Sequence, residues 1–253
     1  MKRILTNKYF LSFIGIILFF LIWVAVYFIA GANRNLFPDP SETFVQMFEF
    51  LKDPYTYKCI WGSFERMLIG FGIGALAAII IGVIVGNHLK LKHVFNPTIV
   101  ALKAIPTAAL TFLFLALAGL RNAPIYIVVI IVFPIVYEAT VSGYSSIDEY
   151  MIMASKVDGS NTFNSNLKIK FPLAFPTITL GLLSSFALSI KIEIMAEVIS
   201  GSSSDGLGRA IASAYISSDN GLVPTFAYSL IAILLMLLVT LLIDVAKKLI
   251  RVK

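Results

Sequence analysis

Residues 67–86 read MLIGFGIGALAAIIIGVIVG, a run of 20 residues without a charged side chain. An α-helix rises about 1.5 Å per residue, so about 20 apolar residues cross the roughly 30 Å hydrocarbon core of a bilayer. This run therefore predicts a transmembrane helix, and similar runs elsewhere in the chain would make the protein polytopic.

Five further apolar runs of similar kind flank the first one. Hydrophobic residues make up 58% of the 253 residues and charged residues only 13%, whereas soluble domains carry about 45 to 50% and about 25%. We therefore predict an all-α membrane protein in which residues 1–253 form one transmembrane domain, without a separate ATPase or solute-binding domain. The six predicted spans are residues 10–31, 67–86, 94–118, 124–141, 172–196 and 224–244.

The basic residues predict the orientation of these spans. Twelve of the 20 Lys and Arg residues fall in four segments that six spans place on one side, and six fall on the opposite side. The positive-inside rule assigns the richer side, and with it both termini, to the cytoplasm. The apolar run nearest the N-terminus, residues 10–31, is too long for a cleaved signal peptide, so we expect it to be an uncleaved membrane anchor. The cytoplasmic segments are residues 1–9, 87–93, 142–171 and 245–253.

Small residues and prolines interrupt the spans at several points. Gly70 with Gly74, and Gly82 with Gly86, have the spacing that allows close helix contact, and packing within one subunit is favoured over a dimer face. Prolines in three spans suggest broken helices around a cavity, as in a transporter. On the outer side, Ser41 is predicted to cap a short helix.

The sequence offers little for catalysis or cofactor binding. The single cysteine and the two histidines, His88 and His93, form no recognisable metal or protease motif, and no Walker sequence is present. The basic residues are dispersed between apolar spans, which favours a membrane surface over nucleic acid as their partner. We predict a protein that is not an enzyme, with no catalytic residue, no metal and no directly bound cofactor.

Residues 142–171 form a polar connection of about 30 residues, which is long for a link between two helices and predicts a docking element. It contains Met153-Ala154-Ser155, three residues, Gly159, nine residues, and then Ile169-Lys170-Phe171-Pro172. This spacing resembles the EAA loop of ABC-importer permeases, whose pattern is E-A-A, three residues, G, nine residues, I, one residue, L-P. Met153, Ser155 and Phe171 depart from the residue types of that pattern.

Three other stretches resemble the nitrate, sulfonate and taurine branch of the same family. They are Ser63-Phe64-Glu65-Arg66 with Gly70-Phe71, Lys103-Ala104-Ile105-Pro106, and Ala196-Glu197 followed by Gly206-Leu207-Gly208. Four matches in the right order make the resemblance specific.

The resemblance implies a type I ABC importer permease in a bacterial inner membrane. Its expected partners are a cytoplasmic ABC ATPase dimer that carries ATP and Mg²⁺, a second permease copy, with a homodimer favoured over a heterodimer, and an extracytoplasmic solute-binding protein. The loop is expected to couple the ATPase to the spans. Its candidate residues are Met153, Ala154, Ser155, Asp158, Gly159, Ser160, Asn161, Phe163, Ile169 and Pro172.

Ionisable residues within spans are costly and therefore functional candidates. Lys103, beside Pro106, either lines the solute path or snorkels, and Glu138 is expected at an interface. Lys191 and Glu193 lie within about two turns of the outer end of their span, where snorkelling is the favoured interpretation and a gate the alternative. Glu193 and Glu197 share one helical face, an unfavourable pairing unless a cation stands nearby, and Lys191 is not on that face.

The predicted function is inward transport of a small solute by alternating access. The solute would be nitrate-, sulfonate- or taurine-like, or a vitamin precursor. The alternative is a self-contained secondary transporter or channel, which would need no ATPase-docking loop.

Overall fold

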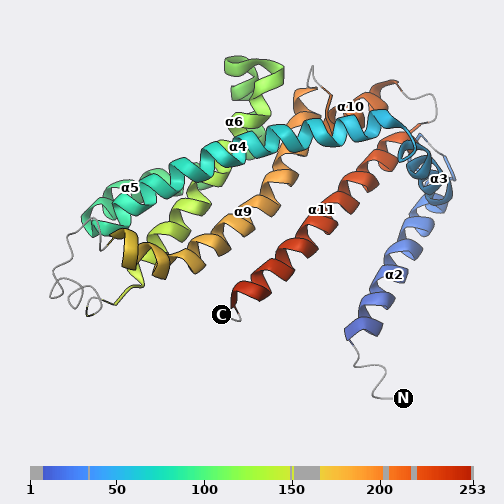
Figure 1. Ribbon diagram of the computed structural model, residues 1–253. Coiled ribbons are helices and arrows are strands. Elements are labelled where there is room, and N and C mark those ends of the chain that lie inside the picture. The colour runs from blue at the N-terminus through green and yellow to red at the C-terminus, as the bar shows by residue number, and fades with distance from the viewer. Residues whose placement is uncertain are drawn as a thin grey trace. The chain divides into compact units, whose positions relative to one another are not determined.

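The computed structural model describes residues 8–33, 35–148, 150, 166–201, 205–217 and 221–251 (Figure 1). In these residues all regular structure is helical, which confirms the all-α part of the predicted fold class. The helices are α2 (Lys8–Ile29), α3 (Pro40–Phe50), α4 (Pro54–Asn87), α5 (Leu89–Ala104), α6 (Thr107–Ser145), the π-helix η1 (Asn166–Lys170), α9 (Phe171–Ser200), α10 (Leu207–Ser217) and α11 (Val223–Arg251).

Within the described residues, four helices are long and apolar enough to cross a bilayer. They are Pro54–Asn87, Thr107–Ser145, Lys168–Ser200 and Val223–Lys248, and a shorter apolar helix covers Ile14–Ile29. Four of these five segments correspond to the predicted spans 10–31, 67–86, 172–196 and 224–244.

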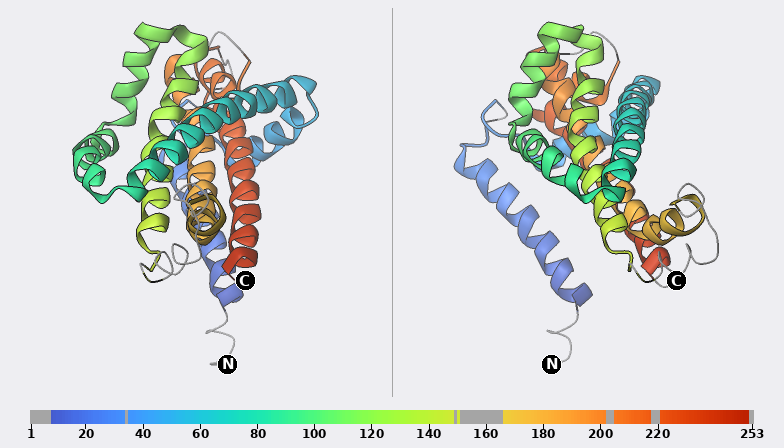
Figure 2. Two further views of the ribbon diagram at one scale, coloured as in Figure 1. Left: turned by 60° about the vertical axis from the view of Figure 1, so that its left-hand side comes forward. Right: turned by 90° about the vertical axis from the view of Figure 1, so that its left-hand side faces the viewer.

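The segment predicted as a single span at 94–118 is divided in the structure. Helix α5 ends at Ala104, and Ile105 and Pro106 adopt extended backbone angles before α6 begins. Proline lacks an N–H group and disfavours helical angles in the residue before it, so Pro106 ends α5. A second break occurs at Gly119, where φ is 74° and ψ is 173°. There α6 turns back on itself, as Figure 2 shows, close to the predicted boundary between 94–118 and 124–141.

The chain divides into two compact units, residues 1–57 with 210–232 and residues 58–209 with 233–253. In the second unit, α6 packs extensively against α9 and also contacts α5. Buried aliphatic side chains of α4, α5, α6 and α9 form its main core, which includes Ala78, Val85, Ile99, Val132 and Ile192.

Glycines bring α4 and α6 into close contact in this unit. A Cβ atom at Gly82 would lie 2.7 Å from the Cβ of Thr140, and one at Gly86 would lie 2.6 Å from the Cβ of Tyr144. Gly70 has a similar approach to Val128, at 2.9 Å. No larger side chain fits at these positions without moving α6, so the small-residue spacing serves packing within the subunit, as predicted.

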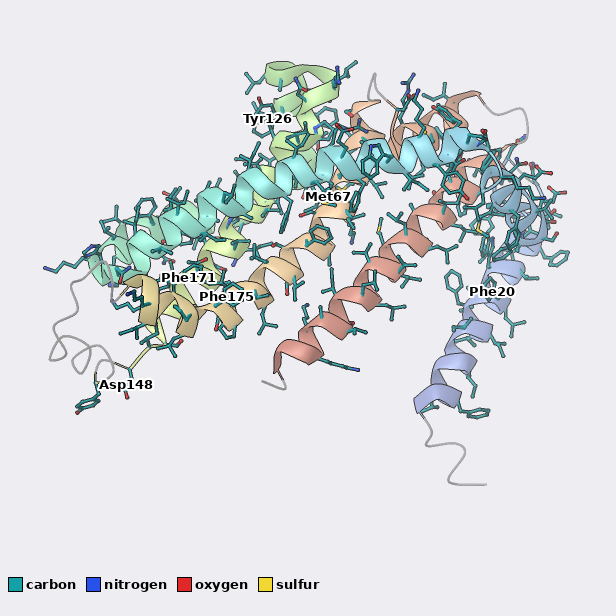
Figure 3. All side chains as sticks on the ribbon, in the orientation of Figure 1. Phe20, Met67, Tyr126, Asp148, Phe171 and Phe175 are labelled. Carbon is teal, nitrogen blue, oxygen red and sulfur yellow. The ribbon has the colours of Figure 1, made fainter. Side chains whose placement is uncertain are left out.

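The start of α9 is tied to the end of α4. Lys170 of η1 donates a hydrogen bond from Nζ to Oδ1 of Asn87, at 2.7 Å, and Asn87 in turn donates to the carbonyl of Val83 at 2.9 Å. Phe171 and Phe175 follow on the first turns of α9, with ring centroids 6.1 Å apart (Figure 3). The C-terminal end of the predicted coupling loop therefore has a fixed attachment to α4.

In the first unit, α3 begins differently from the prediction. Asp39, not Ser41, is the N-cap: its Oδ1 accepts hydrogen bonds from the backbone N–H of Ser41 at 2.7 Å and of Glu42 at 3.4 Å. Ser41 Oγ also donates to this carboxylate, and these bonds hold the pKa of Asp39 below its usual range. Pro40 follows the cap at N1, where its missing N–H costs nothing.

Candidate functional site

A buried ionic cluster joins α4, α9 and the residues that lead into α10, all within the second unit. Ser63 and Arg66 come from α4, Glu193 and Glu197 from α9, and residues 205–208 complete it. Arg66 is 8% exposed, Glu193 1% and Glu197 0%, so the three charges are removed from solvent and lipid by the chain itself. Met67, labelled in Figure 3, marks this part of α4.

Arg66 is the centre of the cluster. Its Nε lies 3.3 Å from Oε1 of Glu193 and 3.2 Å from Oε1 of Glu197. Its Nη2 donates to the same oxygen of Glu197 and, at 3.0 Å, to the carbonyl oxygen of Asp205. One guanidinium therefore connects two turns of α9 to the chain that precedes α10, using the several donors that only arginine offers.

The second carboxylate oxygen of Glu197 accepts two hydrogen bonds. Its Oε2 accepts from Ser63 Oγ at 2.7 Å and from the backbone N–H of Gly208 at 2.9 Å. Ser63 Oγ in turn accepts from the N–H of Leu207 at 2.8 Å. A Cβ atom at Gly206 would come within 2.6 Å of Glu197 Oε1. The chain can pass this close to the carboxylate only because residue 206 is glycine.

Glu193 is less well satisfied than Glu197. Its Oε2 is buried and, within the described residues, has no hydrogen-bond partner. It borders a cavity of about 10 Å³ whose other lining residues are mostly apolar, among them Met67, Ile190 and Leu235. Because Arg66 faces two carboxylates, the three side chains carry an excess negative charge when all are ionised.

A more exposed ion pair lies beside the cluster. Lys58 Nζ is 2.6 Å from Oδ2 of Asp205, and Arg209 Nη1 is 3.9 Å from Oδ1. The Lys58 ammonium holds the pKa of Asp205 below its usual range. Residues 205–209 are thus attached to α4 both by this pair and by the bond from Arg66.

The cluster changes the interpretation of Glu193 and explains its pairing with Glu197 on one face of α9. Glu193 was expected to snorkel, but it is buried, because Arg66 lies within hydrogen-bond distance of it. Arg66 is also the cation that the pairing of Glu193 with Glu197 required. Lys191 is exposed, in agreement with its predicted position on another face. A role of Lys191, Glu193 or Glu197 in a solute path stays a prediction.

Lys103 and Glu138 form a second, exposed ion pair. Lys103 Nζ lies 3.0 and 2.9 Å from the two oxygens of Glu138, and the side chains are 48% and 47% exposed. Lys103 is in the last turn of α5, two residues before the break at Ile105 and Pro106. Glu138, which was expected to find its partner at an interface, therefore has one within the chain.

Most of the predicted coupling residues, Met153 to Phe163, lie outside the described residues. Of the rest, Ile169 is on η1, and Pro172 is an exposed residue in the first turn of α9. Among the described residues, His, Cys, Asp and Glu form no group of three that could hold a metal.

Most residues of the ionic cluster were recognised in the sequence in two separate stretches, but the sequence did not predict that the two stretches would meet. Ser63 and Arg66 belonged to one quoted stretch, and Glu197 with Gly206 and Gly208 to another. One pattern in the sequence could have predicted this contact. Two carboxylates four residues apart need a cation nearby, and an arginine directly precedes another apolar run.

Comparison of the sequence with known proteins gives three findings. The family model described as "Binding-protein-dependent transport system inner membrane component" matches residues 74–252. The nitrate import permease protein NrtB of Synechocystis sp. is 30% identical over 204 residues, covering 75% of this chain and 71% of that protein. A probable ABC transporter permease protein of Brucella melitensis is 25% identical over 208 residues, covering 82% of each.

The fold has a counterpart among solved structures. A structure of the MetNI methionine ABC transporter in inward-facing conformations matches with a TM-score of 0.64 and 15% identity, covering 78% of this chain and 96% of that one. At this identity the match shows a shared fold.

Proposed function

Because this chain belongs to the family of binding-protein-dependent transport system inner membrane components, we propose that it is the permease subunit of an ATP-driven importer that moves a small solute inward by alternating access. The observation that carries the proposal is the extent of the family match, 74–252, which includes three of the four long apolar helices and the polar connection between α6 and α9. The resemblance of that connection to the EAA loop supports the same function.

In this proposal residues 1–253 form a single permease domain with six spans and cytoplasmic termini in a bacterial inner membrane. The third and fourth spans would use α5 and the two limbs of α6, with Gly119 at the turn between them. Two identical copies would assemble with two ATPases, which bind ATP and Mg²⁺, and with an extracytoplasmic binding protein.

The coupling step would begin at the loop of residues 142–171. Movement of the ATPases would displace the loop, and its C-terminal end would carry the motion into α4 through the bond between Lys170 and Asn87. A coupling element must have different contacts in two states, so a rigid connection of this kind serves it better than a flexible one.

The proposed solute is a small anion or zwitterion. NrtB, a relative at 30% identity, is named as a nitrate import permease. Lys191, which is exposed, supplies positive charge that such a solute would meet, and Lys103 would do so once it is released from its ion pair with Glu138.

The first test is purification of the tagged chain in mild detergent, with mass spectrometry of the proteins that accompany it. We expect a stoichiometric ABC ATPase, and ATP-dependent uptake after reconstitution into liposomes. Recovery of the chain alone, with uptake that needs no ATP, would establish the secondary transporter instead.

A substitution in the loop tests the docking assignment. Gly159→Arg should leave the protein in the membrane but abolish recovery of the ATPase, because a bulky charge would occupy the proposed docking turn. Ser146→Arg is the control, since Ser146 is exposed at the end of α6 in the same loop and is not a docking candidate. Equal ATPase recovery from both variants would contradict the docking assignment.

A further inference from the structure

A polar cavity of about 260 Å³ lies between the start of α5 and the C-terminal part of α6, within the second unit. Its volume equals roughly eight to nine water molecules at about 30 Å³ each, enough for a small organic anion. The lining residues are Lys92, Asn96, Ile99, Tyr137, Glu138, Val141, Ser142 and Ser145.

The cavity has a buried base, which includes the Tyr137 hydroxyl without a hydrogen-bond partner in the described residues, and an exposed polar rim. Ile99, Tyr137 and Val141 are 1%, 4% and 3% exposed, whereas the polar lining residues are exposed. The Tyr137 ring packs against Phe133 and Phe95, with centroid distances of 6.0 and 6.4 Å. A base held by aromatic packing gives a preformed concave site, as small-molecule sites usually are.

The charge balance of the rim favours an anion. Glu138 directs both carboxylate oxygens to Lys103, so its negative charge is compensated by a residue outside the cavity lining. The ammonium group of Lys92 has no ion-pair partner within the described residues. Among the described residues, one positive charge on the cavity lining is therefore left without a neutralising carboxylate.

Hydrogen-bond donors line the same cavity as Lys92. The side chains of Asn96 and Ser142 make no hydrogen bond within the part of the chain that the structure describes, so their N–H and O–H groups are available. Ser145 differs, because its hydroxyl already donates to the carbonyl of Val141 at 2.8 Å.

We propose that this cavity binds the oxyanion group of a small solute, such as a carboxylate, a sulfonate or nitrate, with Lys92 supplying the charge and Asn96 and Ser142 the hydrogen bonds. The inference rests on the proposed function and deepens it: the cavity is a station on the cytoplasmic part of the solute path. Ser142 and Ser145 lie in the last turn of α6 and also form the start of the proposed coupling loop, residues 142–171, so movement of the loop would act on the cavity wall.

The same chemistry could be supplied by the phosphate of an anionic lipid, because basic pockets at the cytoplasmic membrane surface bind lipid headgroups. The test therefore separates a soluble oxyanion from a lipid. It uses the full chain, assembled with its ATPase in nanodiscs of phosphatidylcholine, with or without phosphatidylglycerol.

The probe is a single reporter cysteine. Cys59, the sole cysteine, is buried and is replaced by serine, and Ser145→Cys is then introduced at the cavity wall. Two thiol reagents of similar size are compared, anionic 2-sulfonatoethyl methanethiosulfonate and cationic 2-(trimethylammonium)ethyl methanethiosulfonate. Ser146→Cys is the matched control, because Ser146 is the adjacent exposed residue, also loses a hydroxyl bond to the backbone, and does not line the cavity.

We expect the ratio of anionic to cationic labelling rates to be about tenfold higher in the Ser145→Cys variant than in the control, the effect of one charge at close range near a protein surface. Sodium nitrate or taurine should slow labelling of the Ser145→Cys variant in phosphatidylcholine alone. Lys92→Gln should remove both effects, and Ser142→Ala should weaken the protection while leaving the charge preference.

Two results would overturn the inference. Equal ratios at the two reporter positions would show that the cavity does not attract anions. Protection by phosphatidylglycerol but not by nitrate or taurine would identify a lipid as the occupant and remove the cavity from the solute path. ATP-driven uptake by the same samples distinguishes the two proposals: intact uptake with no anion preference overturns the cavity alone, whereas anion preference without ATP-dependent uptake overturns the importer function.

Discussion

The ionic cluster around Arg66 and the pair formed by Lys103 and Glu138 use the same chemical groups in opposite environments. In the first, a guanidinium and two carboxylates are 8%, 1% and 0% exposed and are bonded from three segments of chain. In the second, an ammonium and a carboxylate are each about half exposed and, within the described part of the chain, bond only to each other.

The difference shows that burial, more than the number of ion pairs, decides what a charge does for the fold. A buried charge that loses its partner keeps the full cost of its removal from water, whereas an exposed charge is solvated again. We therefore expect the cluster to hold α4 and α9 together and the Lys103 pair to be free for a role in transport.

The largest expected effect comes from Arg66→Met. It would leave two carboxylates buried without a cation, at a cost of about 3 to 5 kcal/mol in the free energy of unfolding. Thermal unfolding in detergent, followed by size-exclusion chromatography, should show a much lower midpoint. Arg209→Met is the control, since Arg209 is 39% exposed and 3.9 Å from Asp205, and an equal loss in both variants would contradict the importance of burial.

Glu197→Gln should have the next largest effect. Glu197 accepts from Arg66, Ser63 and Gly208, and loss of the charge weakens bonds worth about 1.5 to 3 kcal/mol. The matched variant Glu193→Gln should change stability by less than about 1 kcal/mol, because it removes the excess buried charge and leaves an oxygen for Arg66. The same unfolding assay compares them, and a larger loss for Glu193→Gln would reverse the assigned roles.

Gly206→Ala should destabilise the protein by about 1 to 3 kcal/mol, because the added methyl group would press on the carboxylate of Glu197 and overpack the cluster. Gly72→Ala on α4 is a suitable control. A Cβ atom there meets nothing within 4 Å, and alanine favours a helix over glycine. If the two substitutions lower the unfolding midpoint equally, the close packing at Gly206 is not required.

The smallest effect on stability is expected for Lys103→Met, below about 1 kcal/mol, as for other exposed ion pairs. Uptake in proteoliposomes is the informative measurement. Reduced uptake with unchanged stability would place Lys103 on the solute path, and unchanged uptake would return it to the snorkelling interpretation.

Some features of the fold could be predicted because they are encoded in consecutive residues. The apolar length of 67–86 is sufficient to predict a spanning helix, and α4 contains this segment within a longer helix, Pro54–Asn87. The prolines predicted breaks, but not that Pro106 would end a helix while Pro134 would be tolerated inside one. That outcome depends on whether neighbouring helices support the freed backbone groups.

The sequence by itself determined that this protein is a helical membrane protein and that it resembles importer permeases, because run length, charge distribution and motif spacing are local properties. Only the tertiary structure decided that Arg66 meets Glu193 and Glu197, which are 127 and 131 residues away. It also decided that Lys92, Asn96 and Ser142 surround one cavity. Such contacts depend on which faces of packed helices meet, and this depends on the close packing of α4, α6 and α9 together, which no single stretch of sequence encodes.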